Sequence, residues 1–251
     1  MVQRLGQEGV TRVAMVTGAR GGIGAEAVAR LRSAGHRVAV VGRDAASLAD
    51  VPADAHLAFD ATTPEGSAGA IDACRSQLGN APARLAHRVG STLIAPLHRS
   101  SPAQYRELIR VNLDSAVYMP QAWVEALRGT GAAVRASSMV ARIGVANHEA
   151  VAAAKGGVEA LARSAAAPFA SIGLRVNAVA PGMTETPMTA GMLRLDAMRE
   201  GAGKQYPLGG VQTAAQVVDT IAWPLSDGAA RITGQVIAVD GGFTTVRPLV
   251  K

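Results

Sequence analysis

Short apolar runs rich in valine and alanine alternate along this chain with longer amphipathic stretches. The runs predicted as strands cover residues 12–18, 36–44, 56–61, 84–90, 132–138, 174–182 and 234–242. The stretches predicted as helices cover residues 22–35, 64–79, 101–129 and 148–171. Strands that alternate with helices of this length indicate βαβ units joined by right-handed crossovers. The pattern therefore predicts an α/β protein with a doubly wound parallel sheet.

No low-complexity segment or charge run divides the chain, so we expect one domain over residues 1–251. Residues 183–212 interrupt the alternation and are rich in glycine, methionine and proline. We interpret this segment as a substrate lid, because methionine side chains adapt to apolar ligands. The same side chains would also suit a plain core or an interface. They are Met183, Met188, Met192, Leu193, Leu195, Met198 and Tyr206.

Composition narrows the class of protein. Hydrophobic residues make up 49% of the chain and aromatic residues only 3%, so a core of small aliphatic side chains is expected. Such a core suits parallel strands that are buried on both faces. The single Cys74 cannot form an internal disulfide, and no apolar run approaches the length of a membrane span. These features predict a cytoplasmic protein without a membrane segment.

The net charge of +6 raises the question of nucleic-acid binding. The basic residues are nearly all arginines, and they lie scattered singly from Arg4 to Arg247. A nucleic-acid groove favours basic residues interleaved with aromatic ones, which this chain does not show. We therefore expect a small-molecule substrate and no nucleic-acid partner. No spacing of cysteine or histidine predicts a metal site.

A glycine-rich turn, TGARGGIG over residues 17–24, joins the first predicted strand to the first predicted helix. Glycines allow a sharp turn and a close approach of the backbone to a diphosphate. The helix that follows offers free N–H groups to the same anion. Strand, turn and helix together predict a Rossmann-like dinucleotide site. Its expected contacts here are Thr17, Gly18, Arg20, Gly21, Gly22, Ile23 and Gly24.

The glycines follow the spacing TGxxxGxG, and further landmarks appear in the order found in one known family. They are Asp60 at the end of the third strand, Asn112 in RVNL, NAVAPGMTETPM over residues 177–188, and GQVIAVDGG over residues 234–242. On these landmarks the chain resembles the short-chain dehydrogenase/reductase family along nearly its whole length.

The resemblance implies a nicotinamide dinucleotide cofactor and an oxidoreductase activity. It places Asp60 against the adenine ring and the Pro-Gly segment over the nicotinamide. Lys155 is implied to hold the nicotinamide ribose. The other implied cofactor contacts are Ala61, Gly90, Pro181, Gly182, Thr184 and Thr186.

The end of the second strand bears on the choice of cofactor. NAD enzymes carry an acidic residue there for the ribose 2′-hydroxyl, and NADP enzymes replace it with space and an arginine. Gly42 occupies the acidic position and Arg43 follows it. Arg43, together with Arg20 of the glycine turn, suits a 2′-phosphate. We therefore predict NADP(H) rather than NAD(H), unless Arg43 is only a solvated arginine.

The catalytic pattern of the family is incomplete in this chain. The resemblance implies Ser138, Lys155 and Asn112 as catalytic residues, with a tyrosine four residues before the lysine. Val151 stands at that position, and no YxxxK occurs anywhere in the chain. The family's NNAG motif is also altered to His87-Arg88-Val89-Gly90. The residues expected to bind the cofactor are therefore present, whereas the tyrosine expected to donate the proton is missing.

Three interpretations stay open. The chain is an active oxidoreductase that takes its proton from another group, such as His148, which precedes Val151 by three residues. A substrate that needs no proton at that atom, such as an iminium, is a variant of this interpretation. The second is a dinucleotide-binding protein without catalysis. The third is non-redox chemistry in the same pocket. His148 is otherwise a surface residue at a helix start.

Members of this family usually assemble through the long helices after the fourth and fifth strands. In this chain those helices are predicted over residues 101–129 and 148–171. The second contains a run of alanine and glycine that permits close packing. By this resemblance we expect a homotetramer or a homodimer.

Overall fold

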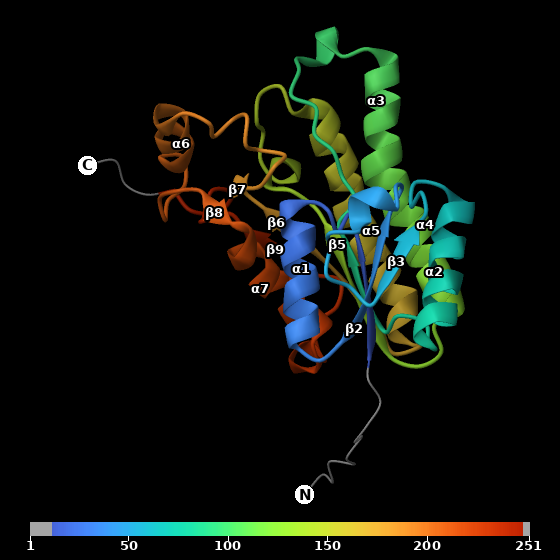
Figure 1. The fold of residues 1–251 in the computed structure, drawn as a ribbon. Helices are drawn as coiled ribbons and strands as arrows, with labels where there is room; N and C mark the ends of the chain where they lie inside the picture. The colour runs from blue at the N-terminus through green and yellow to red at the C-terminus, as the bar shows by residue number, and fades with distance from the viewer. Residues whose placement is uncertain (1–11, 248–251) are drawn as a thin grey trace, which may run out of the picture.

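The predicted strands pair into one parallel sheet in the order β3-β2-β1-β4-β5-β6-β9 (Figure 1). The computed structural model describes residues 12–247. Each predicted strand overlaps one observed strand, which confirms the doubly wound α/β architecture. The strands are β1 Val13–Thr17, β2 Arg37–Gly42, β3 Ala55–Ala58, β4 Arg84–His87, β5 Gly131–Ala136, β6 Leu174–Pro181 and β9 Val236–Val239.

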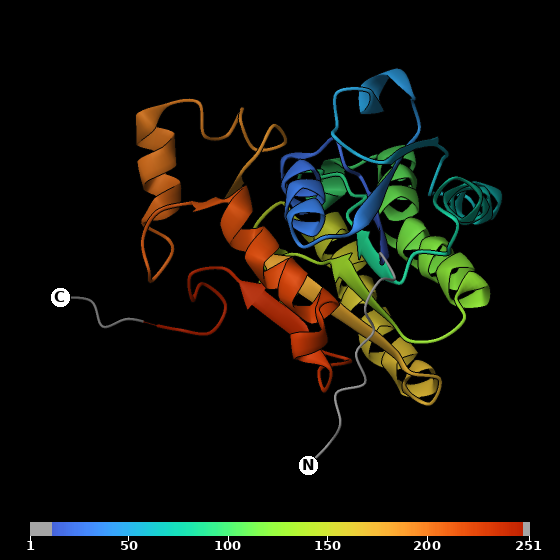
Figure 2. The same cartoon turned by 60° about the horizontal axis from the view of Figure 1, so that its bottom comes forward.

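Helices cover both faces of this sheet, as Figures 1 and 2 show. On one face α1 (Gly22–Ser33) and α7 (Ala214–Leu225) pack against each other and share one aliphatic core with the strands. On the other face α2 (Pro64–Leu78) packs against α4 (Ser115–Ala126), and α5 (Glu149–Ala170) lies against β5 and β6. Alternate side chains of each strand enter the two cores, as expected for a parallel sheet.

Local sequence signals account for the ends of α2. Thr63 accepts a hydrogen bond from the Gly66 amide, and Pro64 occupies the first helical turn. Gly79 ends the helix in the left-handed conformation with φ of 77°. These are the residues that most favour a helix start and a helix end. The predicted range 64–79 is therefore confirmed almost to the residue.

The prediction of one continuous helix over residues 101–129 is wrong. The chain forms α3 (Pro102–Ile109), a π-helical turn (Arg110–Asp114) and then α4. Within the wide turn, Asn112 Nδ2 donates to the Leu108 carbonyl oxygen at 3.0 Å. This amide replaces a main-chain donor that the wider turn has moved away, as occurs at π-bulges near functional sites.

The segment predicted as a lid, 183–212, folds into short elements outside the two helix layers. They are the paired strands β7 (Thr184–Glu185) and β8 (Gln212–Thr213) and the helix α6 (Asp196–Gly203). Both strands contact α7, which follows directly and was not predicted. Thr213 and Gln216 form a capping box at its start. Within residues 12–247, no helix has the length and apolar character needed to cross a bilayer.

Candidate active site

The sheet changes direction of winding between β1 and β4. Strands β2 and β3 lie on one side of β1, and the remaining strands lie on the other. In open parallel sheets, ligands bind beyond the carboxyl ends of the strands at such a point. Two adjoining cavities occupy this edge, and they are described in turn below.

The first, the glycine-loop cavity, follows the turn after β1 and the ends of β2 and β3. Its lining includes residues 18–21, Arg43, Asp60 and Ala61. The second, the Lys155 cavity, lies beyond β4, β5 and β6, and its lining includes Asn112, Ser138, His148, Val151, Lys155, Pro181 and Gly182. Three residues, Arg88, Gly90 and Met188, line both cavities. The two cavities therefore form one cleft.

Steric limits fix the shape of the glycine loop. Gly18 has a φ of 66°, and a Cβ there would lie 2.7 Å from the Arg88 carbonyl oxygen. A Cβ on Gly24 would lie 2.2 Å from the Gly18 carbonyl oxygen. Both positions therefore require glycine. The loop thus presents bare backbone and the start of α1 to the cavity, which is the arrangement that accepts a diphosphate.

The end of β2 carries no acidic side chain. A Cβ on Gly42 would meet Leu48 Cδ2 at 3.1 Å, so space for a carboxylate is restricted. The nearby Asp44 uses both carboxylate oxygens to accept from the amides of Ala46 and Ser47, at 3.0 and 3.2 Å. The exposed side chain of Arg43 lines the cavity, and so does that of Arg20. Positive charge therefore gathers at this end of the cleft.

Asp60 lies at the rim of the glycine-loop cavity and is held in place by its neighbours. Its Oδ1 accepts from the amide and the hydroxyl of Thr62, at 2.9 and 2.6 Å. Arg110 lies 3.4 Å from Oδ2. Partial burial opposes ionisation, but the Thr62 hydrogen bonds and the charges of Arg110 and Arg43 together outweigh it and lower the pKa of Asp60. The carboxylate is thus a fixed anionic acceptor.

Lys155 is buried at the bottom of the second cavity, on the first turns of α5. Its Nζ donates to the Ala136 carbonyl oxygen at 2.9 Å, at the end of β5. Burial, together with the charge of Arg88, lowers the pKa of Lys155 to about 7. A Cβ on Gly90 would lie 3.2 Å from Nζ, so this glycine gives the ammonium its room.

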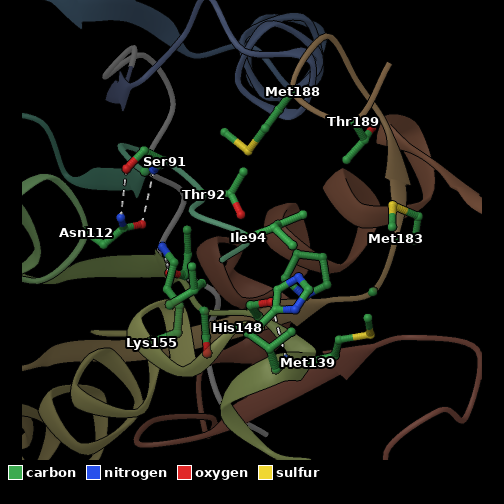
Figure 3. A pocket seen from close by; sticks show the side chains of 18 of the residues that line it. Ser91, Thr92, Ile94, Asn112, Met139, His148, Lys155, Met183, Met188 and Thr189 are labelled. Carbon is green, nitrogen blue, oxygen red and sulfur yellow. Dashed lines mark hydrogen bonds between the residues drawn. The ribbon is translucent and has the colours of Figure 1, made fainter. Parts of the chain in front are cut away.

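Asn112 completes the polar wall beside Lys155 (Figure 3). Its Nδ2 donates to Ser91 Oγ at 3.1 Å, and its Oδ1 accepts from the Ser91 amide at 3.2 Å. The π-helical turn is what directs this side chain inward. Asn112 therefore bonds the main chain at Leu108 and also lines the cavity.

Ser138, Val151 and His148 also line this cavity. Ser138 follows the end of β5 by two residues, and its Oγ accepts from the Val140 amide at 3.4 Å. Val151 is buried and packs with Leu108 and Val140. The position of the expected tyrosine is thus an apolar part of the cavity wall.

His148 is the residue before α5 and was predicted as part of that helix. Its Nδ1 lies 2.8 Å from the Ala146 carbonyl oxygen. Because a carbonyl oxygen only accepts, Nδ1 carries the proton, and Nε2 of the neutral ring then holds a lone pair. Figure 3 shows the ring beside Ile94 in the middle of the cavity. Sulfur atoms of Met139, Met183 and Met188 lie around it.

The altered motif after β4 has a structural role at its first residue. The Thr17 hydroxyl lies 2.9 Å from His87 Nδ1 and accepts from the Arg88 amide at 3.0 Å. His87 Nε2 lies 3.1 Å from Ser115 Oγ, which donates to a main-chain oxygen. This chain of bonds requires a neutral ring with the proton on Nε2. Burial lowers the pKa of His87 to about 3, and nearby positive charges act in the same direction.

The structure brings most predicted site residues to the cleft and leaves some beneath it. Those that line neither cavity are Thr17, Gly22, Ile23, Gly24, Thr184 and Thr186. Thr17 bonds the residues after β4, and a Cβ on Gly22 would meet Thr186 at 3.1 Å. Thr184 donates to the Gly182 carbonyl oxygen at 3.0 Å. These residues do not line the cleft, and they contact the segments that do.

Several lining residues were not predicted to contact a ligand. Thr189 lines the Lys155 cavity and bonds back to the Thr184 carbonyl oxygen. Met139 lies under Tyr206, whose hydroxyl contacts its sulfur at 3.4 Å. Arg88 lines both cavities, and its place in the altered NNAG motif was the one signal available. Within residues 12–247 no group of three His, Cys, Asp or Glu could hold a metal ion.

Comparison with known proteins agrees with this geometry. The family model described as "Enoyl-(Acyl carrier protein) reductase" matches residues 18–244. Cis-4-hydroxycyclohexanecarboxylate dehydrogenase of Sinomonas cyclohexanicum is 38% identical, over 96% of this chain and 100% of that protein. The 3-oxoacyl-[acyl-carrier-protein] reductase of Escherichia coli is 31% identical, over 94% of this chain and 98% of that protein.

A solved structure is similar over the same length. It is a short-chain type dehydrogenase/reductase from Mycobacterium ulcerans, with a TM-score of 0.87 and 28% identity. The match covers 94% of this chain and 90% of that one. The chain therefore belongs to the short-chain dehydrogenase/reductase family, whose relatives named above are oxidoreductases.

Proposed function

We propose that this protein is an NADP(H)-dependent oxidoreductase that acts on a small carbonyl or imine substrate, with His148 in the role of the missing tyrosine. One observation carries the proposal. A single cleft holds a glycine cradle at one end, and at the other it holds Ser138, Lys155 and His148 around the apolar position of Val151.

The residues present fit a nicotinamide dinucleotide. The glycine loop lines the first cavity from Gly18 to Gly21, and its close turn excludes a Cβ at Gly18 and at Gly24 because either would overlap main-chain atoms. Asp60 offers a fixed acceptor for the adenine end, and Lys155 offers its ammonium to the nicotinamide ribose. When bound, the cofactor supplies or accepts a hydride.

The charge at the end of β2 favours a 2′-phosphate over a free hydroxyl. Arg43 and Arg20 line that end, and Asp44 is turned to its own loop. A guanidinium pairs with phosphate through two parallel N–H bonds. NADP(H) is therefore the proposed cofactor, and a titration in which NADH binds as tightly as NADPH would contradict this choice.

The Lys155 cavity suits a compact, mostly apolar substrate with one polar group. Methionine side chains adapt to different shapes, and four of them line this cavity: Met139, Met183, Met188 and Met192. The Ser138 hydroxyl is placed to donate to a carbonyl oxygen and so to stabilise the charge that develops there. The two curated relatives named above act, by their names, on hydroxyl or oxo groups of small acids and acyl chains.

His148 is the proposed proton donor and acceptor for the substrate oxygen or nitrogen. The Ala146 carbonyl fixes the ring through Nδ1, so Nε2 is the atom that exchanges the proton: its lone pair accepts one in the oxidation direction, and the imidazolium form donates one in the reduction direction. Histidine is the side chain that most often serves as a general acid or base in proteins. Lys155 and Asn112 lie across the cavity and are proposed to hold the cofactor and the polar wall in place.

The test is NADPH oxidation against a panel of ketones, cyclic imines and enones. We expect turnover by the unmodified protein and a decrease of about 10²- to 10⁴-fold in kcat for His148→Gln. NADPH affinity should stay unchanged in this variant. Glu149→Gln, an exposed change at the next residue, is the matched control and should keep full activity.

Other outcomes distinguish the alternatives. If the unmodified protein is inactive and the Val151→Tyr variant is active, the pocket is intact and lacks only its proton donor. That result favours a dinucleotide-binding role. A parent that converts substrate without any change in NADPH absorbance would indicate non-redox chemistry. Equal activity of His148→Gln and parent would remove His148 from the mechanism and leave the oxidoreductase standing.

We also propose a homotetramer or homodimer, assembled through the outer faces of α4 and α5. Val117 on α4 is an exposed apolar side chain on the first of these faces. Sedimentation that shows only a monomer at micromolar concentration would contradict this assembly.

A further inference from the structure

Arg88 lies at the junction of the two cavities, and two of its guanidinium nitrogens have no hydrogen-bond partner within residues 12–247. Arg88 lines both the glycine-loop cavity and the Lys155 cavity. Its Nε and Nη1 are shielded from solvent, and within residues 12–247 neither has a hydrogen-bond partner. Burial lowers the pKa of Arg88 to about 10, which leaves the group charged at neutral pH. Shielded donors that make no bond lower stability unless a ligand satisfies them.

The charges around Arg88 do not balance. Arg135 and Lys155 are buried in the same region, and both add positive charge. Glu159 and Asp240 are the buried acids of the part of the chain that the structure describes, and both are occupied. Glu159 accepts from Ser137 Oγ at 2.9 Å. Asp240 accepts from the Gly242 amide and from Thr244 within its own turn. The cluster thus lacks a matching anion.

We propose that Arg88 is an anion-binding residue that takes an oxyanion from a ligand in the cleft. The planar guanidinium can bind phosphate or carboxylate through two N–H groups at once. Its place at the junction matches two such groups, the diphosphate of a dinucleotide that spans both cavities and the carboxylate of a substrate in the Lys155 cavity. The inference rests on the proposed function for the identity of these ligands.

Arg135 provides a matched control within the same molecule. It is a buried arginine, and its Nε and Nη1 also lack partners in the described residues. Burial lowers its pKa to about 10 as well. Unlike Arg88, it lines neither cavity. A loss of ligand binding in an Arg88 variant but not in an Arg135 variant therefore cannot come from the removal of buried charge alone.

The experiment measures binding and requires no turnover. NADPH affinity is measured by fluorescence for the parent, Arg88→Asn, Arg88→Lys and Arg135→Asn. If the oxyanion is the diphosphate, Arg88→Asn weakens NADPH binding by roughly 10- to 100-fold. Arg88→Lys then loses less, because it keeps the charge without the planar fork, and Arg135→Asn binds as the parent does.

A second arm tests the carboxylate. Calorimetry measures cyclohexanecarboxylate and its uncharged carboxamide on the complex with NADP⁺. If the oxyanion comes from the substrate, Arg88→Asn leaves NADPH affinity unchanged and abolishes the preference for the carboxylate. If a folded Arg88→Asn protein matches the parent in both arms, the inference is overturned. Should that variant not fold, Arg88→Lys and Arg88→Gln replace it.

Failure of the proposed function would look different. A parent that binds NADPH but turns over no substrate contradicts the oxidoreductase and leaves both binding arms intact. A parent that binds no dinucleotide contradicts the cofactor assignment. In that case, thermal stabilisation by inorganic diphosphate, compared between parent and Arg88→Asn, still decides whether Arg88 binds an anion.

Discussion

One end of the cleft is formed mainly by main chain, and the other mainly by side chains. The glycine-loop end depends on backbone, since Gly18 and Gly24 leave no room for a Cβ and the loop turns directly into α1. The Lys155 end depends on single side chains that extend from the segment after β5, from α5 and from the turn before α5. A change at the first end disturbs the path of the chain, whereas a change at the second alters chemistry and leaves the path intact.

Val151 illustrates the second case. It packs with Leu108, Val140 and Ala150 in a small apolar cluster. A valine satisfies that packing, so the fold does not require the tyrosine that relatives of this family carry. The difference teaches that the cofactor frame of such a protein is constrained by folding, while its catalytic residues are constrained only by function.

The largest effect is expected at the backbone end. Gly24→Ala should lower the free energy of unfolding by about 3 kcal/mol or more, because the new methyl group would overlap the Gly18 carbonyl oxygen. Thermal denaturation measures the change. Gly21→Ala is the control, since its Cβ would meet its nearest atom at 3.4 Å, and its stability should stay near that of the parent. Equal losses in both variants would contradict the comparison.

A change at the side-chain end should affect rate with little effect on fold. Val151→Tyr introduced into the His148→Gln protein is expected to restore roughly 10²-fold of kcat, because it supplies a phenol beside Lys155. Val151→Phe adds the same ring without the hydroxyl and should restore nothing. Steady-state kinetics compares the two. Rescue by phenylalanine as well would mean that volume, and not the proton, limits turnover.

A pH effect is expected at the buried His87, the residue before Arg88. Its pKa lies at about 3 in the folded protein and near 6.5 in the unfolded chain. Between these values the unfolded chain binds a proton that the folded protein does not, so stability falls as pH drops below about 6.5. The loss from this residue between about pH 7.5 and pH 5 is about 2 kcal/mol.

Denaturant titrations at both pH values test this expectation. His87→Asn removes the titrating ring and keeps a side chain that can bond both Thr17 and Ser115, so this part of the pH dependence should disappear. An unchanged difference between the two pH values would show that other groups cause the acid sensitivity.

The smallest effect is expected at the exposed rim. Arg43→Ala should weaken NADPH binding by about tenfold and leave NADH binding unchanged, because only the former has a 2′-phosphate. Arg99→Ala removes an exposed arginine that lines neither cavity and serves as the control. Fluorescence titration with both cofactors measures the change. Parallel weakening of NADPH and NADH would assign Arg43 to another part of the cofactor.

Much of this molecule could be predicted from its sequence, because its strands and most of its helices carry strong local signals. The strand ranges follow from apolar runs, and α2 follows from Thr63, Pro64 and Gly79. The missed helix α7 also had a signal, the capping pair Thr213 and Gln216. The glycine loop and the end of β2 were found because their residue types are required by local backbone geometry.

The rest depends on contacts between distant segments. The Leu108 carbonyl finds its donor in the side chain of Asn112, and no local pattern distinguishes this π-helical turn from a plain helix. The surroundings of Arg88 include Thr17 at the end of β1 and Lys155 on α5. That Arg88 Nε and Nη1 lack partners in the described residues is a property of the packed molecule, and a sequence pattern alone does not reveal it.

The π-helical turn between α3 and α4 determines which side of α4 faces the sheet. One extra residue in a turn rotates everything after it by about 100° relative to an unbroken α-helix. Helix α3 contacts α5, whereas α4 contacts α2 and β4. Deleting one residue from 110–114 would restore the regular phase and turn the apolar stripe of α4, with Met119 and Trp123, away from the sheet. An insertion or deletion in this turn would therefore disturb the packing of α4 against α2 and β4, although only one residue of the turn, Asn112, lines the Lys155 cavity.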